Sequence, residues 1–137
     1  AIVDDYGHHP TEIAATLAAA KQFWPGRVLI AFQPHRYSRT LHCKEGFLSS
    51  FTGADVLILT DIYSAGEAPI AGVSSEQLVR DISQLPSSPK EVLLGGTLEN
   101  TQSLLLQKMR PGDLVLCMGA GSITKLPSAL VAELEKQ

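Results

Sequence analysis

Long apolar runs are missing from this sequence, and so is the pattern of a secretory signal peptide. The longest hydrophobic stretches have the length of a β-strand, which is too short to cross a bilayer. No basic start is followed by an apolar segment. Cysteine is scarce, because Cys43 and Cys117 are the only two and a disulfide framework needs more of them in a smaller chain. We therefore expect two free thiols and a cytoplasmic protein.

The charge and the composition argue against a nucleic-acid-binding protein and against a disordered chain. The formal net charge of −3 comes without a basic stripe, so we expect no nucleic-acid partner, and the short apolar runs predict no membrane partner. Hydrophobic residues make up 45% of the 137 residues, which indicates one globular domain rather than a disordered chain. The sequence opens without Met and reaches a polar cluster within four residues, so we expect a domain of a longer protein.

The order of the expected elements predicts the fold. Short runs of aliphatic residues alternate with segments of helical periodicity, which is typical of a parallel sheet with crossover helices. The strands are expected at residues 27–33, 56–60, 91–94 and 114–118, with 2–3 as a candidate edge strand, and the helices at 10–24, 39–51, 74–85, 97–109 and 125–136. This order predicts an α/β domain, Rossmann-like and doubly wound, with a mostly parallel sheet and helices on both faces.

Two loop segments concentrate titratable side chains, one from Asp4 to Glu12 and the other from Gln33 to Thr40. Parallel strands place their carboxyl ends at one edge of the sheet, where ligands are usually bound. The loops from Asp61 to Glu67 and from Gly119 to Ser122, with Gly95-Gly96, are expected at that same edge. We therefore expect the polar clusters to converge there.

The first cluster permits two interpretations. Asp4, Asp5, His8 and His9 are side chains that suit several divalent metal ions. Alternatively, acidic side chains before a helix stabilise its amino-terminal end by roughly 0.3–1 kcal/mol. Capping explains one of the acids but neither the second acid nor the two imidazoles.

The second cluster indicates an anion site. Arg36 and Arg39 follow His35 within one turn of an expected helix start, and guanidinium groups match the geometry of carboxylates and phosphates. The alternative is a pair of solvated surface arginines. Their place at the carboxyl end of a strand favours the anion site.

Two further loops leave their roles open. Asp61, Tyr63 and Glu67 are candidates for general acid–base chemistry, although Asp61 is equally a candidate turn cap. The glycines between Gly119 and Ser122 suit a contact with phosphate or carboxylate, but equally a tight strand-to-helix turn. The sequence has no Gly-x-x-x-x-Gly-Lys-Ser/Thr motif, so these 137 residues contain no P-loop.

Four motifs, in matching order from end to end of the chain, resemble the C-terminal domain of the Mur ligase family of bacterial peptidoglycan synthesis. They are Asp-Asp-Tyr-Gly-His-His-Pro-Thr-Glu at 4–12, Phe-Gln-Pro-His-Arg-Tyr-Ser-Arg-Thr at 32–40, Asp-Ile-Tyr-Ser-Ala-Gly-Glu-Ala-Pro-Ile at 61–70 and Met-Gly-Ala-Gly-Ser-Ile at 118–123. The resemblance implies that residues 1–137 are the third domain of a three-domain ligase, inactive alone. The first domain would hold a UDP-sugar, and the second would supply the P-loop and most of the Mg²⁺ ligands.

The resemblance also implies a reaction and roles for residues. Pro34-His35-Arg36 favours the branch that joins L-alanine to UDP-N-acetylmuramate, with ATP and through an acyl phosphate, over relatives that add a preformed peptide. Asp5 would bind the ATP ribose and Tyr6 the nucleotide, with His8 as the catalytic residue at the reaction centre. His35, Arg36 and Arg39 would bind the alanine carboxylate and neighbouring anionic groups.

Two alternatives from other classes stay open at this point. One is a stand-alone metal-dependent hydrolase that uses the Asp/His cluster, and the other is a non-catalytic nucleotide-binding module.

Overall fold

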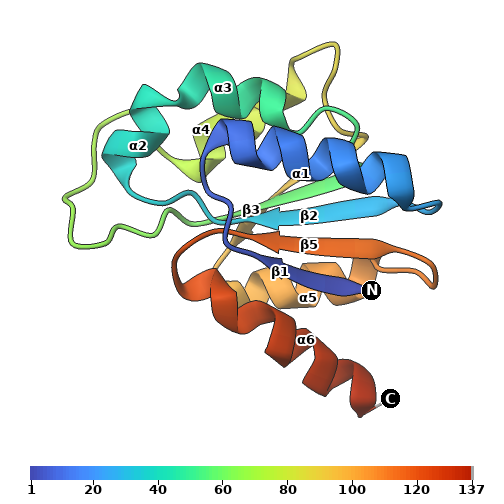
Figure 1. Cartoon of the computed structure of the whole chain (residues 1–137). Helices are drawn as coiled ribbons and strands as arrows, with labels where there is room; N and C mark the ends of the chain where they lie inside the picture. Colours follow the sequence, from blue (N-terminus) through green and yellow to red (C-terminus); the bar gives the residue numbers. More distant parts are fainter. Residues whose placement is uncertain (137) are drawn as a thin grey trace.

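Five parallel strands form one sheet in the order β1-β5-β2-β3-β4. A computed structural model describes residues 1–136 of the chain (Figure 1). The elements are β1 Ile2–Asp5, α1 Pro10–Phe23, β2 Val28–Phe32, α2 Tyr37–His42, α3 Lys44–Ser50, β3 Val56–Thr60, α4 Ser75–Ser83, β4 Glu91–Gly96, α5 Leu98–Lys108, β5 Leu114–Met118, the 3-10 turn η1 Ser122–Lys125 and α6 Leu126–Glu135. The predicted Rossmann-like α/β fold is confirmed, and the candidate edge strand is β1.

Helices cover both faces of the sheet, and each face has its own apolar cluster. α1, α3 and α4 pack on one face, where Ile13, Phe47 and Ile82 are fully or almost fully buried. α5 and α6 pack on the other face, where Leu105 and Leu130 are fully buried (Figure 1). The central strands β2, β3 and β5 are buried along their whole length, as strands covered on both faces must be.

The predicted single helix over 39–51 is wrong. Two helices stand there, and the chain turns between them at Cys43, whose φ is −100° and ψ 11°. α3 follows a different direction because it packs on α1, where Gly46 lies so close to Pro10 that a Cβ would come within 2.8 Å of the proline Cβ. Leu41, which a single helix over 39–51 would place on its inner face with Leu48 and Phe51, is 49% exposed.

The strand predicted at 91–94 continues through Gly95 and Gly96. Gly95 permits a close approach of α5, because a Cβ there would collide with the Thr101 hydroxyl. Gly96 pairs with Thr60 after a shift in register. Because its φ is +71°, the strand ends in a backbone conformation that glycine adopts without strain.

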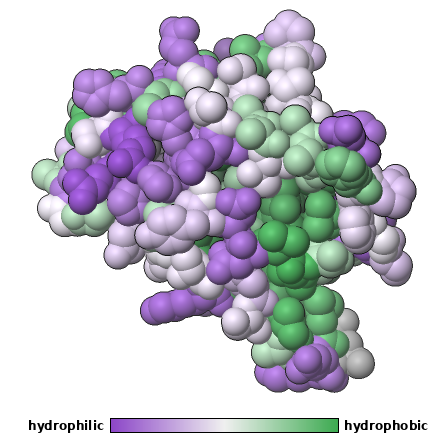
Figure 2. Space-filling view, viewed as in Figure 1, coloured by the Kyte–Doolittle hydropathy of each residue, from purple (hydrophilic) through white to green (hydrophobic). Residues whose placement is uncertain are grey.

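The surface differs between the two ends of the molecule. Hydrophilic side chains gather over α2, whereas apolar ones gather over α6 and β1 (Figure 2). Val3, Val131 and Leu134 contribute to the apolar area and are 39–42% exposed. Within residues 1–136, every helix is too short or too polar to span a membrane.

Candidate functional site

A crevice is expected where neighbouring strands lead to opposite faces of a parallel sheet. β1 and β2 continue into α1 and α2 on one face, whereas β5, which lies between them, continues into η1 and α6 on the other. The polar segments of the sequence follow these three strands and β3. The predicted convergence of the clusters at the carboxyl edge is therefore confirmed for residues 4–12, 33–40, 61–67 and 119–122.

Four aromatic or imidazole rings form a row along this edge. The ring centroids of Tyr6 and His8 lie 6.0 Å apart, those of His8 and His35 5.8 Å, and those of His35 and Tyr63 5.5 Å. The last pair is stacked, and a parallel β-bridge joins the backbones of the same two residues. This ring row connects the loops that follow β1, β2 and β3.

The two neighbouring histidines have different roles in the structure. His9 is the N-cap of α1, because its Nδ1 accepts a hydrogen bond from the Thr11 N–H at 3.2 Å. Glu12 completes the capping box by accepting the His9 N–H, and this bond with others holds the pKa of Glu12 below its usual 4.5. His8 instead contributes its ring to the ring row. The structure thus separates a helix cap from a candidate site residue, which the sequence pattern did not.

The acidic residues of the first cluster also differ. Asp5 is half-buried; its Oδ1 accepts the Gly7 N–H at 2.7 Å, and its Oδ2 lies 3.3 Å from the Thr16 hydroxyl. Asp4 is exposed on the edge strand. No three or more His, Cys, Asp and Glu side chains within residues 1–136 lie close enough to hold a metal ion. The cluster therefore does not assemble as the metal site that its composition suggested.

Gln33 joins the two sides of the crevice, a contact that the sequence analysis did not single out. Its side chain, at the end of β2, donates from Nε2 to the Ser122 hydroxyl at 2.9 Å and accepts at Oε1 from the Ile123 N–H at 3.0 Å. Gly121 lies against it, since a Cβ there would be 2.7 Å from Oε1 and 2.6 Å from the Tyr63 ring. Gln33 thus fixes the glycine loop, residues 119–122, against the ring row. In the sequence, the polar residue directly after the apolar run of residues 28–32 was the signal that could have pointed to Gln33.

The arginines lie beside the ring row, and within residues 1–136 their guanidinium groups have no carboxylate partner. Arg36 is exposed and Arg39 half-buried, and none of the ion pairs among residues 1–136 includes either of them. The Nδ1 atom of His35 is buried and has no hydrogen-bond partner within the same residues. The guanidinium groups are thus the charged groups of this edge that remain available to an anionic ligand.

The Glu67 carboxylate is engaged in the fold. It accepts hydrogen bonds from the N–H of Ser38 at 3.0 Å and from the Ser38 hydroxyl. The hydrogen bond from the Ser38 hydroxyl contributes most to holding the pKa of Glu67 below its usual 4.5, and the bond from the Ser38 N–H contributes next. The Glu67 carboxylate is therefore a weak base near neutral pH. The Ser38 N–H at the start of α2 is therefore bound to Glu67.

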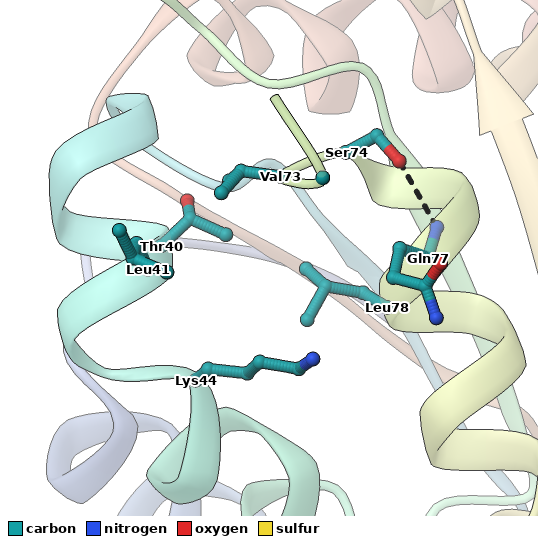
Figure 3. A pocket seen from close by; sticks show the side chains of 8 residues that line it. Thr40, Leu41, Lys44, Val73, Ser74, Gln77 and Leu78 are labelled. Carbon is teal, nitrogen blue, oxygen red and sulfur yellow. Dashed lines mark hydrogen bonds between the residues drawn. The ribbon is translucent and has the colours of Figure 1, made fainter. Parts of the chain in front are cut away.

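Two hollows differ in their fitness for a ligand. One, of about 280 Å³, opens at the carboxyl edge and is lined by Gln33, Asp61, Tyr63, Thr97 and Ser122 among others. The other lies between α2 and the start of α4, lined by Thr40, Lys44 and Gln77 among others (Figure 3), and measures about 40 Å³. The second is too small for a substrate, whereas the first lies at the edge where the polar clusters meet, so the edge hollow is the candidate pocket.

The protonation of His35 gives a pH dependence of stability. Burial, with the nearby charges of Arg39, His8 and Arg36, lowers the pKa of His35 from its usual 6.5. The unfolded chain therefore binds this proton more readily than the folded one. The contribution of His35 to the free energy of unfolding should be fully present above pH 6.5 and be lost as the pH falls through the lower folded pKa.

Urea unfolding between about pH 7.5 and about pH 5.5 checks this expectation. The loss of stability should be smaller in His35→Gln than in the unsubstituted protein. His42→Gln, an exposed position on α2, serves as the control and should keep the full loss. Equal losses in all three proteins contradict the assignment to His35.

The fold and the edge together define a class: an α/β domain that presents an imidazole–arginine cluster to a ligand at the carboxyl edge of a parallel sheet. Comparison with known proteins gives the family. The family profile described as "Mur ligase, glutamate ligase domain" matches residues 1–121. The chain therefore belongs to the Mur ligase family.

Among curated proteins, the UDP-N-acetylmuramate–L-alanine ligase of Geobacter sulfurreducens is 50% identical over 136 residues, which are 98% of this chain and 29% of that protein. The chain thus spans less than a third of the length of the curated relatives it matches. Among solved structures, a murein peptide ligase from Psychrobacter arcticus has a TM-score of 0.75 at 22% identity, covering 99% of this chain and 28% of that one. The MurF ligase from Thermotoga maritima, in complex with ADP, has a TM-score of 0.65 at 17% identity, covering 98% and 29%. These structures share the fold.

Proposed function

We propose that residues 1–137 are the C-terminal, third domain of a cytoplasmic ligase that joins L-alanine to UDP-N-acetylmuramate. ATP would phosphorylate the substrate carboxylate, and the amine of L-alanine would then attack the acyl phosphate, releasing phosphate. The observation that carries the proposal is the pair of guanidinium groups beside the ring row that have no carboxylate partner in the described part of the chain, residues 1–136. The 50% identical relative with this activity in its name supports the choice of substrates. The free thiols of Cys43 and Cys117 are compatible with a reducing cytoplasm.

The loop after β1 would face the nucleotide. Asp5 uses one contact on each carboxylate oxygen, and a carboxylate has further lone pairs that can accept ribose hydroxyl groups. Tyr6 is 67% exposed, so its ring is free to contact the nucleotide. His8 would be the catalytic residue. Its Nδ1 lies 3.1 Å from the Tyr6 carbonyl, and the tautomer that donates this bond leaves Nε2 as an acceptor for a proton of the attacking amine.

The loop after β2 would bind the amino acid. Arg36 and Arg39 would hold the alanine carboxylate and neighbouring anionic groups, because guanidinium groups bind carboxylates through paired, charge-assisted hydrogen bonds. His35 would line the same site with its half-buried ring, which stacks on Tyr63. The edge hollow of about 280 Å³ is close by, since Gln33 and Tyr63 line it.

The remaining parts of the site would come from the rest of the ligase. No P-loop is found in the sequence, and no metal-ligand group is found within residues 1–136, so these residues do not fit a Mg²⁺ site of their own. We assign the P-loop and the Mg²⁺ ligands to the central domain and the UDP-sugar to the N-terminal one. Closure of this domain over the central one would exclude water from the acyl phosphate.

An ADP-release assay tests the proposal. The full-length protein should release ADP only when ATP, UDP-N-acetylmuramate and L-alanine are all present, and residues 1–137 alone should release none. Turnover by residues 1–137 alone would refute the division of the site between domains. Turnover with a preformed peptide in place of L-alanine would identify the peptide-adding branch of the family instead.

A further inference from the structure

The loop between β3 and α4 makes a specific contact with the start of α2. Both contacts run from Ser38 to the Glu67 carboxylate, one from the backbone N–H and one from the hydroxyl, and Figure 1 shows the loop lying beside α2. The loop also reaches the end of β2, because Arg36 donates its N–H to the Tyr63 carbonyl at 2.7 Å and Tyr63 donates its own to the Pro34 carbonyl at 2.8 Å. Hydrogen bonds therefore join the loop between β3 and α4 to the residues before and after Arg36 as well as to Arg36 itself.

Backbone strain is concentrated at this contact. Within residues 1–136, the only non-glycine residues with positive φ are Arg36, at 67°, and Ala65, at 50°. Ala65 and Gly66 form a turn that the Glu67 N–H closes onto the Ser64 carbonyl at 3.0 Å, and this turn presents Glu67 to Ser38. Strained backbone of this kind costs roughly 1–3 kcal/mol per residue and persists where surrounding contacts enforce it, commonly at functional sites.

Hydrogen bonds on both sides hold Arg36 in its strained conformation. Its N–H is bound by Tyr63, and its carbonyl accepts the Thr40 hydroxyl at 2.8 Å and the Thr40 N–H at 3.1 Å. Glu67 fixes Ser38, which lies between Arg36 and Arg39 in the chain. Both oxygens of Glu67 bind Ser38, and none of the ion pairs among residues 1–136 joins Glu67 to either arginine. The carboxylate orders the segment and leaves both guanidinium groups available to a ligand.

We propose that Glu67 is a positioning residue of the amino-acid site, acting through Ser38 and the backbone of residues 36–39. This inference rests on the proposed function. Glu67 does not touch the substrate; it holds the loop after β2 in the conformation in which Arg36 and Arg39 meet the carboxylate of the incoming amino acid.

Steady-state kinetics of the full-length ligase test the inference. Glu67→Ala should raise the KM for L-alanine about tenfold or more, since a misplacement of about 1 Å can cost about 100-fold. The KM for ATP should stay within about twofold, because the hydrogen bonds of the Glu67 carboxylate among residues 1–136 go to Ser38 and not to the loop after β1. Glu76→Ala, an exposed glutamate in the first turn of α4, is the matched control and should leave both KM values unchanged.

A double-mutant cycle separates positioning from general damage to the fold. Because Glu67 acts on Arg36 as well as on Arg39, adding Glu67→Ala to Arg36→Ala should raise the KM for L-alanine by a smaller factor than Glu67→Ala does in the unsubstituted ligase. Faster hydrogen exchange at residues 36–40 in Glu67→Ala, with unchanged exchange in the central strands, should accompany the kinetic effect. An unchanged KM for L-alanine, or fully additive effects, would overturn the inference alone. If the unsubstituted ligase does not use L-alanine at all, the proposed function is overturned, and the inference with it.

Discussion

Arg36→Ala in the full-length ligase is expected to raise the KM for L-alanine about 10- to 100-fold, because charge-assisted hydrogen bonds to a carboxylate contribute about 1.5–3 kcal/mol. The substitution keeps a side chain at a residue whose φ is +67°, so the backbone strain is similar in both proteins. The kcat should fall less than kcat/KM if the arginine binds substrate and transition state alike. Initial rates over a range of L-alanine concentrations, at saturating ATP and UDP-N-acetylmuramate, measure the effect.

Two variants make this expectation specific. Arg36→Lys keeps the charge but loses the planar fork, so its KM should lie between those of the unsubstituted and alanine proteins. Arg80→Ala removes an exposed arginine on α4 whose side chain bonds Gln77, and it should leave the KM for L-alanine unchanged. A KM for L-alanine that is the same in Arg36→Ala and in the unsubstituted ligase removes Arg36 from the amino-acid site.

The features that were predictable from the sequence are the ones with local causes. β5 was predicted at residues 114–118 and lies there, because five consecutive apolar residues between turns suit a strand buried on both faces. The convergence of the polar loops followed from parallel strands alone. The start of α1 was predicted at Pro10, although its cap, His9, is not a residue type that capping patterns favour.

What was not predictable depends on contacts between distant segments. The chain turns at Cys43 without a Gly or Pro there to signal it, because α3 packs on Pro10 of α1. Glu67 was a candidate base by residue type, and only the fold shows its carboxylate bound to Ser38. Likewise, the distinction between His8 and His9 arises from the geometry of the α1 cap.

Substitution of a residue that connects the two sides of the crevice therefore tests the candidate site most strongly. Gln33 is the clearest such residue. Gln33→Leu keeps the bulk of the side chain but leaves the buried Ile123 N–H without an acceptor and the Ser122 hydroxyl without its donor. An unpaired buried polar group costs about 1–3 kcal/mol, so the free energy of unfolding should fall by that amount. The glycine loop should also move relative to the ring row, and kcat/KM of the full-length ligase should fall about 100-fold, which is more than the loss of stability explains.

The order of effects in neighbouring variants distinguishes this role from simple destabilisation. Ser122→Ala removes one of the two hydrogen bonds and keeps the Ile123 contact, so it should lower kcat/KM less than Gln33→Leu does. Gln107→Leu, at an exposed position on α5, should change neither stability nor kcat/KM by a measurable amount. If Gln33→Leu destabilises the protein but leaves kcat/KM of the folded enzyme intact, Gln33 stabilises the sheet edge without positioning the site. If kcat/KM falls as expected, the contact of Gln33 with the glycine loop is what sets the loops after β2 and β5 in their active arrangement.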